Sequence, residues 1–183
     1  KINQFYLFIF LILIALFCSQ VFAQEVNLTG LPIIRNYPPS ENGGTTQNWA
    51  IVQDKRGIMY FANTGGLLEY DGSNWRMIEV ENEVARTVAI DSAGTIFVGG
   101  VDQFGILVPD EIGRLKYKSL INFIPIEERN FGDVWTIWPV KDGVYFQTKS
   151  HIFFYKNSIL YSTENNSDAV KFWKSKSIFS PAF

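Results

Sequence analysis

The sequence predicts an all-β fold built of repeated four-stranded antiparallel sheets, and two patterns indicate it. The first pattern is local: short runs rich in β-branched and aromatic residues alternate with turns that contain Gly, Asp or Asn. Four strands separated by such turns are expected at residues 49–53, 58–62, 67–70 and 75–80. Strands this short, joined by tight turns, form an antiparallel meander.

The second pattern is a repeat of the first. The turn glycines Gly57 and Gly94 occupy the same place in two copies, and the second copy places strands at residues 88–91, 95–99 and 105–108. A looser third copy has strands at residues 134–140, 144–148, 152–155 and 159–162, and a fourth copy begins near Ser177. Repeats of about 40 residues, each a four-stranded sheet, are typical of β-propeller blades.

The repeats divide the chain into expected parts. Residues 24–47 form a leader with turns around Pro38 and Gly43 and a short edge strand at residues 31–34, and residues 33–36 are a candidate to complete the last blade. Blades are expected at residues 48–84, 85–133 and 134–170, with the start of a next blade at residues 171–183. Because propellers close with about four to eight blades, this incomplete propeller is expected to be the N-terminal piece of a longer protein.

Residues 1–23 have the pattern of a secretory signal peptide. Lys1 precedes an unbroken apolar run at residues 5–17, and Val21-Phe22-Ala23 offers a cleavage site before Gln24. The apolar run is shorter than the roughly 20 residues of a membrane-spanning helix, so a cleaved helix is favoured over a retained anchor. A lipoprotein site at Cys18 is disfavoured because bulky Phe17 precedes it.

Composition argues against several kinds of site. Cys18, the sole cysteine, lies in the segment expected to be removed, and the formal net charge of −2 offers no basic surface for nucleic acid. Asp54 and Asp91 each supply one carboxylate to a turn, whereas Ca²⁺ takes about six to eight oxygens. The one histidine, His151, cannot build a zinc site without cysteines. We therefore expect neither a metal nor a cofactor.

A ligand site is expected on one rim of the propeller. The loops between second and third strands share this rim with the connections between blades, and the longest connection is the insertion at residues 121–133. These loops hold short polar groups beside apolar Phe104 and Phe131, a mixture that suits a hydroxylated ligand. The candidate ligand-binding residues are Asn63, Thr64, Asp102, Gln103, Arg129 and Asn130. The alternative is that they satisfy turn backbone and that sensing occurs at a dimer surface.

Three tryptophans lie on expected first strands, at positions 49, 135 and 138. Depending on register, they pack between sheets or surround the axial channel, where aromatic rings suit flat sugar or peptide ligands. Core packing is expected for at least two of the three, because each sheet of a repeat array buries both faces.

Several stretches resemble the propeller repeats of large bacterial sensors. Residues 30–37 (GLPIIRNY) and 44–49 (GTTQNW) look like the opening of such proteins, and residues 66–72 (GLLEYDG) and 94–100 (GTIFVGG) resemble their two-component-regulator propeller repeats. The third copy departs from this pattern, with His151-Ile152 where the repeat has Gly-Leu. The resemblance implies an extracytoplasmic propeller followed by a triple-tyrosine β-sandwich, a membrane helix and a cytoplasmic output such as a histidine kinase or helix-turn-helix regulator.

The expected function is therefore ligand sensing by a membrane-bound bacterial signal-transduction regulator, in a region that is not itself an enzyme. Its expected partners are a small ligand, with glycan-derived compounds as candidates, the remaining blades and signalling domains of the same chain, and a second copy in a homodimer. Its expected location is the periplasmic side of the inner membrane. The alternative is a secreted carbohydrate-active or carbohydrate-binding propeller. An active site of that kind needs two carboxylates about 5–10 Å apart, for which Glu69 and Asp102 are candidates.

Overall fold

The computed structural model describes residues 34–164 and 170–173, together with residues 4, 6, 9, 10 and 30. The chain divides into two compact units, Lys1–Asn36 and Tyr37–Phe183. In the first unit residues 4, 6, 9 and 10 are helical, and the rest of the predicted signal peptide lies outside the described residues. The start of a fourth blade, predicted at residues 171–183, is described only for the three residues that end strand β13.

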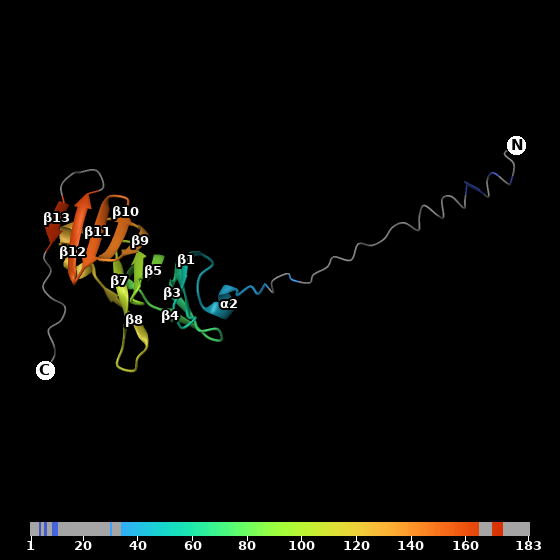
Figure 1. Ribbon diagram of the computed structural model, residues 1–183, viewed down its shortest axis with the longest axis horizontal. Helices are drawn as coiled ribbons and strands as arrows, with labels where there is room; N and C mark the ends of the chain where they lie inside the picture. The colour runs from blue at the N-terminus through green and yellow to red at the C-terminus, as the bar shows by residue number, and fades with distance from the viewer. Residues whose placement is uncertain are drawn as a thin grey trace. The chain divides into compact units, whose positions relative to one another are not determined.

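In the described part of the second unit the strands form three antiparallel sheets, which confirms the all-β, blade-like fold (Figure 1). Blade 1 has the order β1-β2-β3-β4 and blade 2 the order β5-β6-β7-β8. The bounds are β1 (Asn48–Gln53), β2 (Met59–Asn63), β3 (Gly66–Tyr70), β4 (Trp75–Ile78), β5 (Ala85–Ile90), β6 (Ile96–Gly100), β7 (Phe104–Pro109) and β8 (Leu115–Ser119).

Blade 3 differs from the expected four strands. It contains β9 (Val134–Val140), β10 (Gly143–Thr148), β11 (His151–Lys156) and β12 (Ile159–Glu164), and a fifth strand, β13 (Val170–Trp173), pairs with β12. The fifth strand is possible because β12 presents an unpaired edge, and an edge strand accepts a further strand through its free backbone groups.

The acidic turns between first and second strands have the geometry of tight turns. In blade 1 the backbone N–H of Gly57 donates to the Asp54 carbonyl at 3.0 Å, and the Asp54 carboxylate accepts from the N–H groups of Arg56 and Ile58. Asp91 and Gly94 repeat the backbone bond at 3.0 Å. Both glycines have positive φ, 87° and 91°, which glycine adopts at little cost. This geometry supports the turn interpretation over a calcium site.

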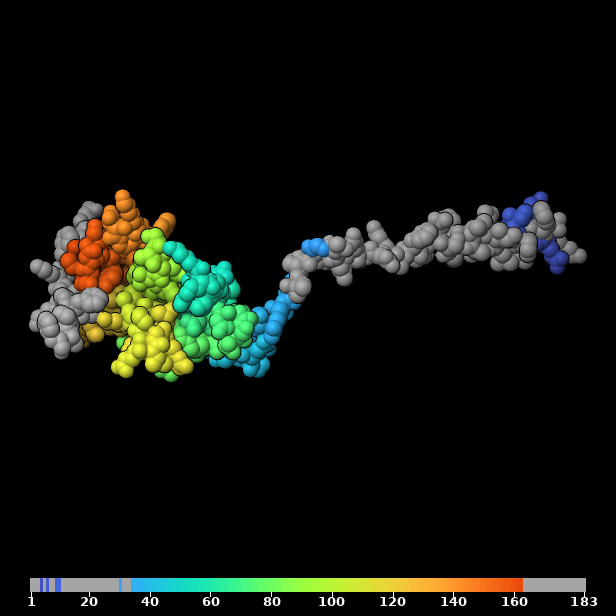
Figure 2. All heavy atoms as spheres, turned by 60° about the horizontal axis from the view of Figure 1, so that its bottom comes forward, coloured from blue at the N-terminus to red at the C-terminus, as the bar shows by residue number. Residues whose placement is uncertain are grey.

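The inner strands of the three blades lie side by side, with β5 between β1 and β9. One hydrophobic cluster fills the space between blades 1 and 2, and includes Tyr60, Leu67, Val88 and Leu107. A second fills the space between blades 2 and 3, where the Phe104 and Phe146 rings stack at 4.4 Å between centroids. In the space-filling view, the blades from blue-green to orange accordingly pack as neighbours (Figure 2).

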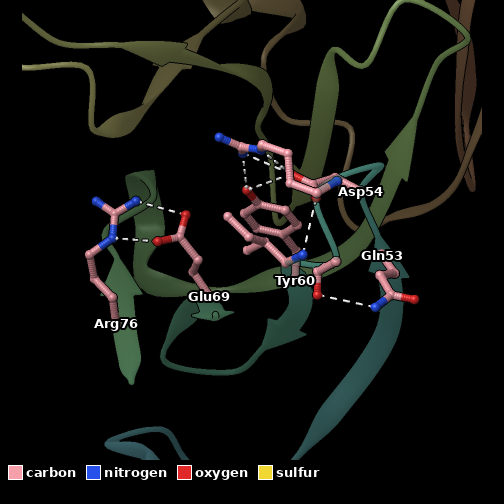
Figure 3. A network of polar contacts seen from close by, with 8 residues as sticks. Gln53, Asp54, Tyr60, Glu69 and Arg76 are labelled. Carbon is pink, nitrogen blue, oxygen red and sulfur yellow. Dashed lines mark hydrogen bonds and ion pairs between the residues drawn. The ribbon is translucent and has the colours of Figure 1, made fainter. Parts of the chain in front are cut away.

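Blade 1 contains a polar network that includes Tyr60, Glu69 and Arg76 (Figure 3), and Arg76 extends it to blade 2. Arg76 on β4 donates two hydrogen bonds, both 2.9 Å, to Glu69 on β3, and a third to the Leu115 carbonyl on β8 at 3.0 Å. Nearby, burial raises the pKa of the Tyr60 hydroxyl to about 12. Burial also acts to raise the pKa of Asp54, but hydrogen bonds from Arg56 and Ile58 outweigh it and hold that pKa below its ordinary value.

The leader from Tyr37 onward is part of the blade structure. No strand forms at residues 34–38, and the expected turn around Pro38 is a single helical turn, α2 (Pro39–Asn42). This turn begins with a proline at the first helical position, and it ends at Gly43, whose backbone is in the left-handed region. No edge strand is therefore formed at residues 34–36, residues 31–33 lie outside the described residues, and completion of the last blade by this segment stays a prediction. The Tyr37 ring packs against those of Tyr70 and Trp75 on blade 1.

The insertion at residues 121–133 is anchored in the core. It forms two short 3-10 helices, η2 (Ile121–Phe123) and η3 (Ile126–Glu128). Its residues Phe123, Ile124 and Phe131 are buried in the cluster between blades 2 and 3. The insertion thus holds a fixed place on the rim.

Candidate functional site

The loops predicted to share one rim do contact one another. The β6–β7 loop meets the end of the insertion, where Val101 forms a β-bridge with Asp133 and the Asp102 N–H donates to the Gly132 carbonyl at 2.9 Å. The β10–β11 loop joins them, since the Ser150 hydroxyl donates to the Phe131 carbonyl at 3.4 Å. These contacts bring loops of blades 2 and 3 and the insertion together.

Each inner strand carries a β-bulge next to this rim, at the same place in all three blades. In β1 the register passes from Asn48↔Asn63 to Ala50↔Ala62, so Trp49 has no partner. The same shift leaves Arg86 unpaired in β5 and Trp135 unpaired in β9. Because a bulge bends the strand and re-aims the unpaired side chain, each blade turns one large side chain out of the regular alternation.

The three re-aimed side chains meet in what we call the rim cluster: Trp49, Thr64, Arg86, Asp133 and Trp135. The indoles of Trp49 and Trp135 lie edge to face with centroids 6.4 Å apart, and the Arg86 guanidinium carbon lies 4.3 Å from the Trp49 ring centroid. Arg86 Nε donates to Asp133 Oδ1 at 2.7 Å, and Trp49 Nε1 donates to Thr64 Oγ1 at 3.1 Å. The cluster therefore links three blades through side chains alone.

The rim cluster combines exposed aromatic surface with polar groups. Trp49 and Trp135 are 40% and 52% exposed. The side chains of Arg86 and Asp133 are less exposed, at 20% and 29%. A pair of exposed large apolar side chains beside a half-buried ion pair is the combination of groups that small-molecule recognition sites use.

The expectation that at least two of the three tryptophans pack in the core is wrong. Trp49, Trp135 and Trp138 are all exposed, Trp138 at 68%. The bulges take Trp49 and Trp135 out of the sheet interfaces. Trp138 instead lies on the outward face of blade 3, opposite Tyr145 of β10.

The predicted site residues of blade 1 have different surroundings. Thr64 belongs to the rim cluster. Asn63 is fully buried, and its side chain accepts from the N–H groups of Thr45 and Gly65 and donates to the Thr45 carbonyl and the Asn48 side chain. Its amide therefore holds the leader against blade 1 and is not available on the surface.

Asp102 and Gln103 also hold backbone. Asp102 Oδ1 accepts from the Gly132 N–H at 2.6 Å, and Asp102 itself has a positive φ of 52°. Gln103 is buried, and its side-chain amide donates to the carbonyls of Glu81 and Val84. Both residues fix the geometry of the rim loops, as the alternative interpretation expected, and direct contact with a ligand stays a prediction for them.

Arg129 and Asn130 lie on the insertion. Arg129 Nε donates to the Ile124 carbonyl at 2.8 Å, which joins the two ends of η3, and Asn130 is exposed. Among the described residues, no hydrogen bond, ion pair or ring contact joins either residue to the rim cluster, so a ligand-binding role for them also stays a prediction.

Sequence reasoning missed Arg86 and Asp133. The signal for Arg86 was present, because alignment of the repeats puts it where Trp49 and Trp135 stand in the other two copies. Asp133 could not be found in this way, since it belongs to the insertion and has no counterpart in the first copy.

The described residues offer no support for metal or glycosidase chemistry. Among them, no group of three or more His, Cys, Asp or Glu side chains is placed to hold a metal ion. Glu69 is engaged in two hydrogen bonds with Arg76, and Asp102 with Gly132. Nor does the described part of the chain contain a helix with the length and hydropathy needed to span a bilayer.

Comparison with known proteins identifies the fold. No protein-family profile matches the sequence, and no curated protein matches it. Among solved structures, the chain is similar to the extracellular domain of a protein described as a hybrid two component system, BT3049, from B. thetaiotaomicron, with a TM-score of 0.50 and 14% sequence identity. The match covers 78% of this chain and 17% of that one, so the chain spans a small part of the protein it resembles. It therefore shares the fold of a segment of that extracellular domain.

Proposed function

We propose that this chain is the ligand-sensing propeller region of an exported bacterial signal-transduction regulator, and that the ligand binds at the rim cluster. The observation that carries the proposal is the coincidence of three β-bulges, one per blade, that aim Trp49, Arg86 and Trp135 at one place. Bulges at equivalent positions of repeated blades cost ladder hydrogen bonds in each copy. A shared binding surface explains why the same irregularity occurs three times.

The chemistry of the cluster indicates the kind of ligand. Exposed indoles provide flat apolar surface, and Thr64, Arg86 and Asp133 provide hydrogen-bonding groups close to it. A compound with a ring whose faces are apolar and whose edge carries hydroxyl groups, such as a sugar, fits this combination. The similarity to an extracellular domain of a two component system and the N-terminal export pattern support sensing outside the cytoplasm.

In this proposal the complete protein is anchored in the inner membrane, with the propeller on the periplasmic side. The rim binds ligand, and further domains of the same chain carry the signal to a cytoplasmic output. The chain itself performs no catalysis. A carbohydrate-active propeller is less favoured because Glu69 and Asp102, its candidate acids, are engaged in structural hydrogen bonds.

The experiment is a ligand screen of the complete protein by thermal shift against oligosaccharides and peptides, followed by calorimetry on each hit. Trp135→Ala should weaken binding of the true ligand about tenfold or more, because truncation of a central aromatic anchor removes most of its contact surface. Trp135→Phe should retain most of the affinity. Ile112→Ala, a control at an exposed residue on the β7–β8 hairpin, should leave affinity unchanged. Equal affinity of the wild type and Trp135→Ala would place the ligand elsewhere.

A further inference from the structure

Arg86 occupies the centre of the rim cluster, and two neighbours determine how its guanidinium is placed. One face of the guanidinium lies over the Trp49 ring at 4.3 Å, and its Nε donates to Asp133 at 2.7 Å. Stacking and a charge-assisted hydrogen bond together restrict a side chain that is otherwise flexible. Arg86 is thus held in one orientation before any ligand arrives.

The remaining hydrogen-bonding capacity of Arg86 is not used by its neighbours. A guanidinium has five N–H donors, and within the described residues its hydrogen bond is the one from Nε to Asp133. Its Nη groups make none with those residues, although the side chain is only 20% exposed. The edge formed by two Nη groups matches the two oxygens of a carboxylate, which accepts a parallel pair of hydrogen bonds from it.

We propose that Arg86 makes the rim cluster selective for an acidic saccharide, one whose sugar ring carries a carboxylate. In this arrangement the ring lies against the Trp135 indole, and the carboxylate accepts from the Nη groups of Arg86. Asp133 is a positioning residue that holds Nε and turns the other edge of the guanidinium to the ligand. The inference rests on the proposed function, because it names the ligand class of the same site.

The charge balance of the cluster favours a carboxylate over a more highly charged group. Asp133 already compensates the Arg86 charge, so a bound monoanion leaves the site with one net negative charge and a phosphate or a doubly charged group leaves more. Repulsion from Asp133 grows with each added negative charge, at the short distances that hold here. Trp135, 52% exposed, supplies the ring contact that a small inorganic anion cannot use.

The test compares matched oligosaccharides on the complete protein by calorimetry. Each pair consists of an oligosaccharide with uronic acid units and the same compound with its carboxyl groups reduced to alcohols. The wild type should bind at least one acid about tenfold or more tighter than its reduced partner, since charge-assisted bonds exceed neutral ones. Arg86→Gln should abolish that preference and Asp133→Asn should weaken it. Arg56→Gln, which removes an ion-paired arginine from the turn at Asp54, should leave it intact.

Each outcome separates the two proposals. Equal binding of acid and reduced partner by the wild type overturns acid selectivity while the sensing site stands. Retained preference in Arg86→Gln overturns the role of Arg86. If no saccharide binds and the wider screen finds a ligand that depends on Trp135, the acidic-saccharide inference fails and the proposed function survives. If the ligand found does not depend on Trp135, both fail. Circular dichroism of each variant excludes loss of fold as the cause.

Discussion

At the scale of single residues, the rim depends on polar side chains that are buried. Asn63 illustrates this, because a polar group at the end of a strand in a loop-rich region would ordinarily be expected to face solvent. Here its amide completes hydrogen bonds of the Thr45 and Gly65 backbone. A buried backbone group without a partner is costly, so Asn63 stabilises the leader and the β2–β3 loop at once.

Asn63→Ala should lower the free energy of unfolding by about 2–3 kcal/mol, because it leaves buried N–H and carbonyl groups unsatisfied. Urea denaturation followed by tryptophan fluorescence measures the change. Asn130→Ala is the matched control at an exposed asparagine of the same rim, and should change stability by less than about 0.5 kcal/mol. Equal effects of the two substitutions would contradict the anchoring role of Asn63.

At the scale of secondary-structure elements, the blades are joined by more than apolar packing. Strands β4 and β8 are the outer strands of neighbouring blades, and Arg76 connects them through its bond to the Leu115 carbonyl. The two bonds to Glu69 hold the guanidinium in the orientation that this contact needs. Removal of one partner of a half-buried pair leaves the other partner without compensation.

Arg76→Gln should therefore destabilise the contact between blades 1 and 2 by about 1–3 kcal/mol. Hydrogen exchange provides the measurement, and faster exchange is expected for the amides of β4 and β8 than for those of β10 and β11. Arg114→Gln alters an exposed arginine on the neighbouring hairpin, and exchange should stay as in the wild type. Unchanged protection of β4 in Arg76→Gln would show that apolar packing alone holds the two blades together.

At the scale of the whole molecule, the repeat gives each blade one face directed to the next blade. On blades 1 and 2 this face carries Tyr60 and Phe97, which belong to the clusters between blades. On blade 3 the matching face carries Trp138, paired with Tyr145 and 68% exposed. An apolar cavity of about 480 Å³ lies there, lined by Thr136, Trp138, Val140, Tyr145, Gln147 and Ile152. Exposed apolar surface of this kind promotes association.

The 183-residue chain should accordingly self-associate in solution at micromolar concentration, through the outward face of blade 3. Light scattering coupled to size exclusion measures its mass as a function of concentration. Trp138→Glu should shift the mass toward the monomer, because burial of an unpaired charge opposes contact between apolar faces. Association that persists in Trp138→Glu would assign it to another surface. The comparison variant is Trp135→Glu, which places the same charge in the rim cluster and not on the outward face of blade 3.

The sequence by itself determined the class of fold, the repeat and most strand positions. Turn residues such as Asp54 and Gly57 act locally, and alternation along a strand is also a local property, so both are readable without the fold. The tertiary structure alone decided which side chains share a surface. A β-bulge depends on the register between two strands, which is why the exposure of Trp49 and Trp135 was predicted wrongly. The ion pair of Arg86 with Asp133 joins strand β5 to the end of the insertion, 47 residues further along the chain, and the fifth strand of blade 3 depends on the free edge of β12. These are long-range contacts, and no local pattern along the chain specifies which of them will form.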